Sequence, residues 1–219
     1  MNLFRLIEKE FRIEMARMAV LAGLLLYLIS TVFILYVSFQ FRQNLLNAVV
    51  WSALFWVVSF FAFINAGAKS FIGEKKGTDV YYYWLVSPEA LLFSKIIYNT
   101  LLCMVLAFSG WLIFGLLLSN PIEDTLIFSL LIALAATGFS STLTLMSGIA
   151  SRSGNSHVVM SVLSLPVVIG MLLNCVKITR NCIDGLGWDA SQGHLLVLLA
   201  INVLLTATAY LLFPYIWRS

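Results

Sequence analysis

Charged side chains are scarce in this sequence of 219 residues. Only 11% of the residues are Asp, Glu, Lys or Arg, whereas 61% are hydrophobic and the mean hydropathy is +0.98. A soluble domain usually has about 25% charged and roughly 45–50% apolar residues. This composition excludes an ordinary soluble globular domain and predicts an integral membrane protein.

Internal repeats and low-complexity linkers are absent as well. The length leaves room for about six membrane-crossing helices of ~20 residues each with short connections. We therefore predict an all-α fold, with one polytopic membrane domain over residues 1–219 and six transmembrane helices. The predicted spans, bounded by charged residues, are 19–39, 45–68, 91–118, 125–150, 157–176 and 195–217.

Between their charged ends, the predicted spans contain no Asp, Glu, Lys or Arg. Proton relays, voltage sensors and many ion-coupled carriers need such residues, so a self-powered ion-driven transporter is disfavoured. Small and hydroxyl residues gather in the fourth span, and Pro166 and Gly170 would weaken or kink the fifth. This pattern favours close helix packing, with a polar translocation surface and gating as the alternative. The residues of this candidate set are Ser141, Thr144, Gly148, Arg152, Pro166 and Gly170.

Catalytic and metal-binding groups are few. His157 and His194 fall at opposite faces of the predicted membrane and cannot share a metal, so we predict no metal site and no catalytic site. The stretch 66–70 contains Gly-Ala-Lys-Ser but lacks the adjacent Gly-Lys and the earlier glycine of a phosphate-binding loop, so this chain is not expected to hydrolyse ATP. Cys175 and Cys182 fall at or beyond the outer end of the fifth span, where a disulfide could form in an oxidising compartment; the bridged and free states are both open.

The first 18 residues are not expected to be a signal peptide, because acidic and basic residues alternate and no short apolar core with a cleavage site follows. Phe4, Ile7, Phe11 and Met15 recur at helical spacing, and the charged residues lie mostly elsewhere on the helix. The pattern predicts an amphipathic helix over 1–18 that lies in the membrane interface. A simple continuation of the first span is the alternative.

Lys and Arg gather on one side of the predicted membrane. Arg42, Lys177 and Arg180 are assigned to the outer side, near a short turn at Arg42 and in a longer segment over 177–194; an acidic turn over 120–124 lies there too. The ten others share the inner side: Arg5, Lys9, Arg12, Arg17, Lys69, Lys75, Lys76, Lys95, Arg152 and Arg218. This bias predicts that both termini are cytoplasmic. It also explains the net charge of +3 without any nucleic-acid partner.

The longest interruption between two apolar blocks reads KSFIGEKKGTDVYYYWLVSPEALLFSK over residues 69–95. Its charges exclude its first part from hydrocarbon, and the aromatic run 81–84 suits a membrane surface or a protein partner. Ser87, Pro88 and Glu89 predict a helix start, with Ser87 as N-cap and Pro88 at the first helical position. We expect a surface-lying cytoplasmic element joined firmly to the third span.

This layout resembles the ABC-2-type permease subunits, which have an amphipathic start, six spans and a structured cytoplasmic loop after the second span. More specifically, GEKKGTDVYYYWLVSPEALLFSK is similar to the acidic, Gly-Thr, Ser/Leu-Pro and Lys pattern in the loop of the haem exporter B family, CcmB. The segment RSGNSHVVMSVLSLPVVIGMLL resembles that family's Arg, apolar run and Leu-Pro pattern. The chain departs from the family at Gly170, where relatives often carry a second proline, and in the aromatic run 81–84.

The resemblance implies a permease subunit of the bacterial inner membrane that serves haem delivery and chaperone release in cytochrome c maturation. Its implied partners are an ABC ATPase that binds ATP, other haem-handling membrane subunits, a periplasmic haem chaperone and a second copy of the chain, within the lipid bilayer. No cofactor is predicted on this chain itself, and haem would be handled through the complex. The alternatives are an ABC-2 exporter of a lipid, glycan or drug, and a non-transporting scaffold.

The implied role of the loop over 69–90 is to couple this chain to its ATPase. The expected coupling residues are Glu74, Lys75, Gly77, Thr78, Asp79, Tyr82, Tyr83, Ser87 and Pro88. The polar residues would orient the contact, and the aromatic residues would supply buried area. The alternative is an aromatic belt that only fixes the helix at the lipid surface.

Overall fold

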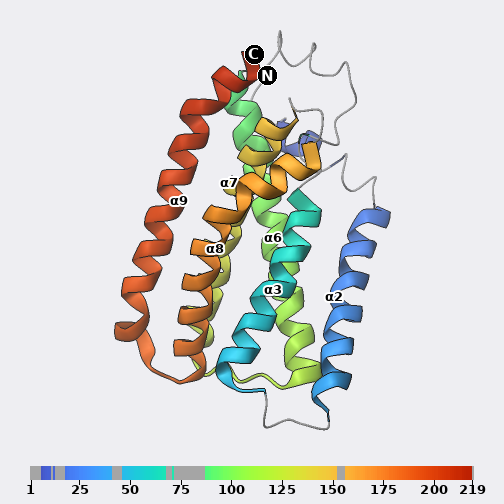
Figure 1. Ribbon diagram of the computed structural model, residues 1–219, viewed down its shortest axis with the longest axis vertical. Helices are drawn as coiled ribbons and strands as arrows, with labels where there is room; N and C mark the ends of the chain where they lie inside the picture. Colours follow the sequence, from blue (N-terminus) through green and yellow to red (C-terminus); the bar gives the residue numbers. More distant parts are fainter. Residues whose placement is uncertain are drawn as a thin grey trace.

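The computed structural model describes residues 6–10, 12, 18–40, 46–67, 71, 87–151 and 156–218. Within these ranges the regular secondary structure is helical, and six helices are long and apolar enough to cross a membrane. The all-α, six-span prediction is therefore confirmed. The helices are α2 (Met18–Phe39), α3 (Ala48–Gly67), α6 (Pro88–Leu118), α7 (Thr125–Ala150), α8 (Ser156–Ile183) and α9 (Gly187–Arg218) (Figure 1).

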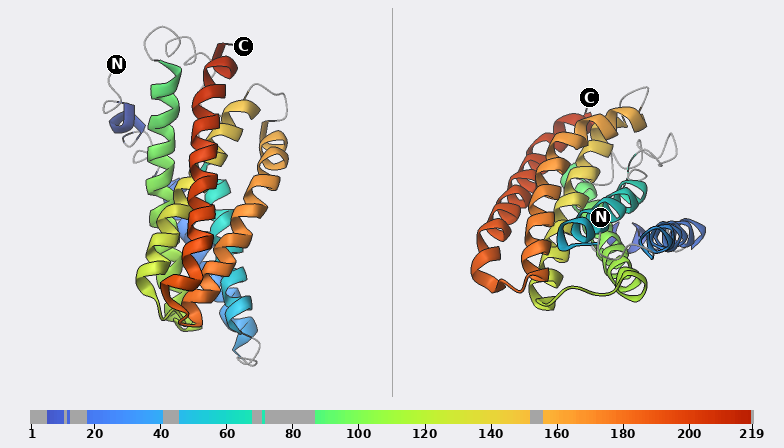
Figure 2. Two further views of the ribbon diagram at one scale, coloured as in Figure 1. Left: turned by 90° about the vertical axis from the view of Figure 1, so that its left-hand side faces the viewer. Right: turned by 60° about the horizontal axis from the view of Figure 1, so that its bottom comes forward.

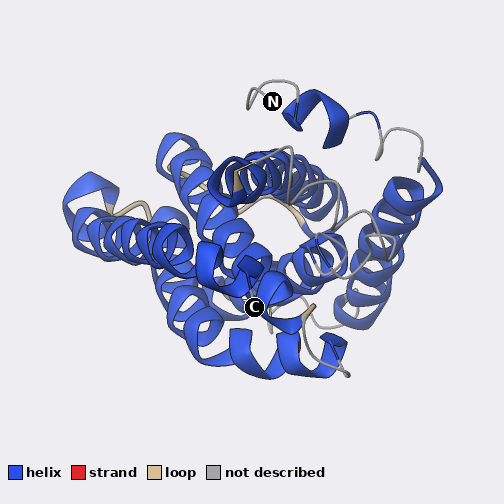
Figure 3. Ribbon diagram, turned by 90° about the horizontal axis from the view of Figure 1, so that it is seen from above, coloured by secondary structure: helices blue, strands red, loops and turns tan. Residues whose placement is uncertain are grey.

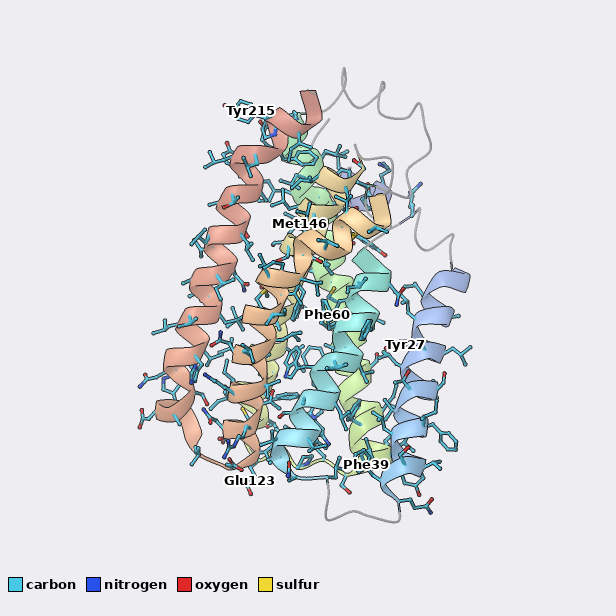
Figure 4. All side chains as sticks on the ribbon, viewed as in Figure 1. Tyr27, Phe39, Phe60, Glu123, Met146 and Tyr215 are labelled. Atoms are coloured by element: carbon cyan, nitrogen blue, oxygen red, sulfur yellow. The ribbon has the colours of Figure 1, made fainter. Side chains whose placement is uncertain are left out.

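The six helices stand side by side in one bundle. One end of the bundle, here called the terminal face, carries residues 6–10, the start of α6 and the end of α9 with Tyr215, whereas Phe39 and Glu123 mark the opposite face (Figures 1 and 4). Helix α7 packs against α6, α8, α9 and α3, and 67% of its most apolar window is buried; for α2, at the edge, the share is 17%. Helix α7 is thus the central element.

An aromatic core fills the half of the bundle near the opposite face. Trp51 stacks on Phe55 of the same helix, α3, with ring centroids 5.5 Å apart. Phe55 then meets Phe114 of α6 and Phe128 of α7, each at 5.5 Å. Such pairs contribute about 0.5–1.5 kcal/mol beyond the area that they bury. Because lipid tails are as apolar as these side chains, this packing, and not the exclusion of water, holds α3 against α6 and α7.

The two last helices are longer than the sequence predicts. Helix α8 ends at Ile183 instead of residue 176, and α9 begins at Gly187 instead of residue 195. The predicted outer segment over 177–194 is therefore wrong, because the two helices are joined by 184–186 alone. Lys177 and Arg180 end the hydrophobic stretch, but charged residues are compatible with a helix and α8 continues past them. Near the end of α8, Arg180 Nε lies 3.4 Å from Asp184 Oδ2, one turn further on.

A tight network closes the opposite face. Gly185 and Gly187 have φ angles of 61° and 70°, the left-handed conformation that glycine adopts without strain. The backbone N–H groups of Glu123 and Asp124 donate to the Cys182 carbonyl at 3.1 and 3.2 Å, and Gly187 N donates to Asp124 Oδ2 at 3.2 Å. The acidic turn over 120–124, which joins α6 to α7 as predicted, thereby also holds the α8–α9 turn.

Cys175 and Cys182 both lie inside α8, seven residues apart, and both are free and buried. Seven residues along a helix correspond to a rise of roughly 10 Å, whereas a disulfide needs Cα atoms within about 7 Å of each other. Of the two states that the sequence left open, this structure has the free one. The physical reason is the extension of α8, which carries both residues along a single rigid axis.

Helix α8 contains Pro166 in its interior. A proline at such a position removes a backbone hydrogen bond and crowds the preceding turn, which bends a helix. The part of α8 nearest the terminal face indeed runs at an angle to the rest (Figures 1 and 2). Gly170, one turn further on, has open space where a Cβ would lie. A gating role for either residue stays a prediction.

Candidate functional site

Both ends of the predicted coupling loop can be placed, although most of its expected residues cannot. Glu74, Lys75, Gly77, Thr78, Asp79, Tyr82 and Tyr83 lie outside the described residues, as does Arg152. Ser87 has φ −68° and ψ 140°, its hydroxyl accepts a hydrogen bond from Ala90 N at 3.4 Å, and Pro88 opens α6. The helix start that the sequence predicts is confirmed. The loop therefore ends on a capped helix that continues through the bundle.

At the other end of the loop, Phe71 is fixed to two further helices. Its backbone N–H donates to Ser147 Oγ of α7 at 3.2 Å, and its ring lies 5.2 Å from that of Phe213 on α9. Gly148 makes this approach possible, since a Cβ there would lie 3.1 Å from Phe213 and 3.7 Å from Phe71. The loop thus starts on α7 and α9 and ends on α6.

A buried cation lies beside this anchor. Lys95 of α6 is 2% exposed, and its Nζ lies 4.8 Å from the centroid of the Phe71 ring. Glu10 Oε1 lies 3.5 Å from the same nitrogen and also 3.0 Å from Lys9 Nζ. A buried charge is stabilised by the opposite charges that lie next to it, and removing one of them is typically destabilising. Glu10 and Lys95 therefore stabilise each other in the interior.

This pair was not predicted. Lys95 was counted only among the cations of the inner side, and the available signal was a lysine set within an apolar run, LLFSKIIY. Ile7 and Phe11 were predicted to lie on the apolar face of an interfacial helix, whereas the structure buries Leu6 and Glu10 against the bundle. Of that predicted helix, 6–10 and 12 are helical and the rest up to residue 17 lies outside the described residues. The segment 6–10 lies beside the bundle at the terminal face (Figures 2 and 3).

These contacts sit in one apolar cluster at the terminal face, which is separate from the aromatic core. It joins the N-terminal segment, the loop start and three helices. We call it the terminal cluster, and its buried members are Leu6, Phe71, Leu91, Leu92, Ile96, Leu145, Ala209 and Phe213. Because members come from five parts of the chain, a displacement of the loop start would be felt by α6, α7 and α9 together.

The hydroxyl residues of α7 are bonded to the helices around it. Towards α6, Ser140 Oγ donates to the Ile96 carbonyl at 2.8 Å, and Asn99 Nδ2 donates to Thr144 Oγ1 at 2.8 Å. Such bonds between helices contribute about 0.6 kcal/mol each inside a membrane, with a maximum near 1.7. They are directional, so they fix the register of α6 on α7.

Helix α9 is held to α7 in the same way. Asn202 Nδ2 donates to the Leu134 carbonyl at 2.7 Å and to Thr137 Oγ1 at 3.0 Å, and the hydroxyls of Ser141 and Thr206 are 3.4 Å apart. The polar group of the fourth span is therefore engaged in helix contacts, which supports packing over a translocation surface. A gating role for Ser141, Thr144 or Gly148 stays a prediction.

Two cavities lie among the described residues. One, of about 220 Å³, lies at the opposite face between α2, α3 and the end of α6, with Tyr36, Trp51 and Ser119 in its wall. The other, of about 420 Å³, is a groove on the lipid side between α6 and α9, with Phe93, Thr206 and Tyr210 in its wall. Neither brings together a nucleophile and a base, and the described residues hold no group of three His, Cys, Asp or Glu side chains placed for a metal ion.

The terminal face therefore brings together the N-terminal segment, the loop start and three helices. A search of the curated proteins finds no match. The family model described as "CcmB protein" matches residues 1–215, nearly the whole chain. This chain thus belongs to the CcmB family, the multi-pass inner-membrane permease subunits of ABC transporters that act in cytochrome c-type biogenesis.

Proposed function

We propose that this chain is the permease subunit through which a separate ABC ATPase drives haem delivery, including release of a haem-loaded periplasmic chaperone, in cytochrome c maturation. ATP would bind to the partner, because the sequence lacks a phosphate-binding loop. The work of hydrolysis would then arrive by contact with the loop over 69–90. Haem would be bound by partner subunits, and the membrane complex would contain a second copy of this chain.

One observation carries the proposal, namely the anchoring of the loop at both ends. Phe71 is hydrogen-bonded to α7 and packed on α9, and Ser87 with Pro88 opens α6. A displacement of a loop that is attached in this way is passed on to the spanning helices. A loop with flexible attachments would move without moving them. The loop therefore has the attachment that a coupling element requires.

The orientation that this role needs is the one that the charges favour. Ten of the 13 Lys and Arg residues are assigned to the side that carries the loop and the termini. We propose that this terminal face is cytoplasmic, where an ATPase has access to ATP. The opposite face, with the 120–124 turn and the α8–α9 turn, would then face the periplasm and the haem chaperone.

The decisive experiment compares aromatic residues inside and outside the loop. Tyr82→Ala with Tyr83→Ala should leave the chain inserted and abundant, but it should release the ATPase in mild detergent and abolish holocytochrome c formation. Tyr215→Ala is the matched control, because Tyr215 is a 77% exposed tyrosine at the same face (Figure 4). Should the double variant keep the ATPase, the haem-handling partners and normal holocytochrome, the loop is a lipid anchor and the proposal is wrong.

A further inference from the structure

We propose that the N-terminal segment 6–10 is a brace of the coupling loop, and that Lys95 is the positioning residue through which it acts. The inference rests on the proposed function and assigns a part of it to a segment that the sequence marked as a membrane anchor. The brace is the ion pair between Glu10 Oε1 and Lys95 Nζ, 3.5 Å apart, set against the ring of Phe71.

The burial of the pair separates it from an ordinary surface contact. Lys95 is 2% exposed and Glu10 is 8% exposed. In the same segment, the side chains of Glu8 and Arg12 also pair, at 3.0 Å, but they are 58% and 81% exposed. An exposed pair of this kind contributes little, whereas a buried charge must keep its partner. The ion pair therefore helps to hold Glu10 in place. If the segment moved away from the bundle, Lys95 would lose its contact with this carboxylate.

Lys95 connects three parts of the chain at one nitrogen atom. It belongs to α6, it pairs with Glu10 of the N-terminal segment, and it lies 4.8 Å above the ring of Phe71, where a cation is attracted to the aromatic face. Leu6, which is fully buried, reaches the same terminal cluster as Phe71. The segment thus supports the loop start both through Lys95 and by direct apolar packing.

The consequence of losing Glu10 follows from this arrangement. Without the carboxylate, the buried Lys95 ammonium loses one of its partners, and its position over the Phe71 ring is held less firmly. The loop start then loses its electrostatic link to α6, although the apolar cluster that it shares with α6 and its contacts with α7 and α9 remain. A smaller part of a displacement at Phe71 would then be passed on to α6. We therefore expect partial uncoupling, in which ATP is still hydrolysed but less of the work reaches the membrane helices.

The test uses the whole complex in membranes and measures holocytochrome c formed per ATP hydrolysed. Glu10→Gln should lower this ratio by about tenfold, a change within the range known for residues that carry coupling between sites. Glu8→Gln, which makes the same change on the exposed side of the segment, should leave the ratio at the wild-type value. A merely structural defect would lower abundance, ATPase activity and holocytochrome together, so the ratio would not move.

Exchange of the two charges provides the second arm. Glu10→Lys and Lys95→Glu should each reduce the ratio, and the two changes combined should perform better than either alone, since the opposite charges meet again. The brace is refuted if Glu10→Gln behaves like Glu8→Gln, or if the exchanged pair is no better than the single variants, including in the amount of chain that accumulates. If instead the wild-type chain copurifies no ATPase, it is the proposed function that fails.

Discussion

Among the glycines that the structure describes, Gly138 has the least room for a Cβ atom. It lies in α7 where α8 and α9 both approach, and a Cβ there would fall inside van der Waals contact of Asn202 Oδ1 and Met171 Cε, with Asn202 Cγ at 3.1 Å. The Met171 methyl group can rotate away. The Asn202 amide cannot, because its Nδ2 is bonded to the Leu134 carbonyl and to Thr137 Oγ1. Gly138→Ala must therefore break these bonds or push α9 outwards.

The size of the effect can be worked out from three contributions. Overpacking of a filled site costs about 1–3 kcal/mol. Loss of two hydrogen bonds between helices adds roughly 1 kcal/mol in a membrane, and the better helix propensity of alanine returns about 1 kcal/mol. The net loss in the free energy of unfolding is about 1–3 kcal/mol, which lowers the Tm of a chain of this size by roughly 2–12 °C.

The protein supplies its own reporter and control for this measurement. Cys103, Cys175 and Cys182 are all buried, so a maleimide dye that fluoresces on reaction with thiols follows unfolding in detergent. Gly170→Ala makes the same chemical change in α8, where no atom lies within 4 Å of the new Cβ. It should leave the Tm unchanged or raise it slightly. A Gly138→Ala protein as stable as the Gly170→Ala protein would refute the reasoning.

A double substitution tests the assigned cause. If the clash with Asn202 dominates, the cost of Gly138→Ala should be much smaller in a protein that already carries Asn202→Ala, because the space beside the new methyl group is then free. The two changes would thus be strongly non-additive, as expected for residues in contact. Additive losses would show that the damage at Gly138 arises elsewhere, such as at Met171.

Two further predictions concern the orientation of the chain in the membrane and the thiols of α8. A reporter that works only in the periplasm should be active when fused after Gly187 and silent when fused after Ser219, and the reverse pattern would overturn the proposed orientation. Because Cys175 and Cys182 are free, protein unfolded without reductant should already take up dye at all of its thiols. A clear rise in labelling when reductant is added would contradict the structure of α8.

The sequence predicts the helices well where hydropathy and helix formation end together. The fourth span matches α7 at both ends, and Ser87 with Pro88 marks the start of α6, because capping chemistry is local. The prediction fails at the end of α8, where the helix continues past Lys177 and Arg180, and at the start of α9, where it begins before Asp189 and His194. Hydropathy shows which residues tolerate lipid. It does not show how far a helix continues beyond the lipid.

The pairing of polar residues could not be predicted, because it depends on which helices become neighbours. The hydroxyl residues of the fourth span indicated helix contacts, but nothing local shows that Thr144 meets Asn99 of α6 while Thr137 meets Asn202 of α9. The same holds for Glu10 and Lys95, which are far apart in the sequence. In both cases the residue type signals that a partner is needed, and only the fold identifies the partner.

These directional contacts matter more here than they would in a soluble protein. Lipid tails offer an apolar side chain nearly the same surroundings as another helix does, so apolar packing alone sets the position of a helix along its neighbour only weakly. Helix α7 instead carries bonds to α6 through Thr144, to α9 through Thr137 and to the loop start through Ser147. Because α7 is bonded at three positions along its length, we expect it to move together with the parts to which it is bonded. We therefore infer that a displacement at Phe71 would shift α7 together with α6 and α9, without sliding between them.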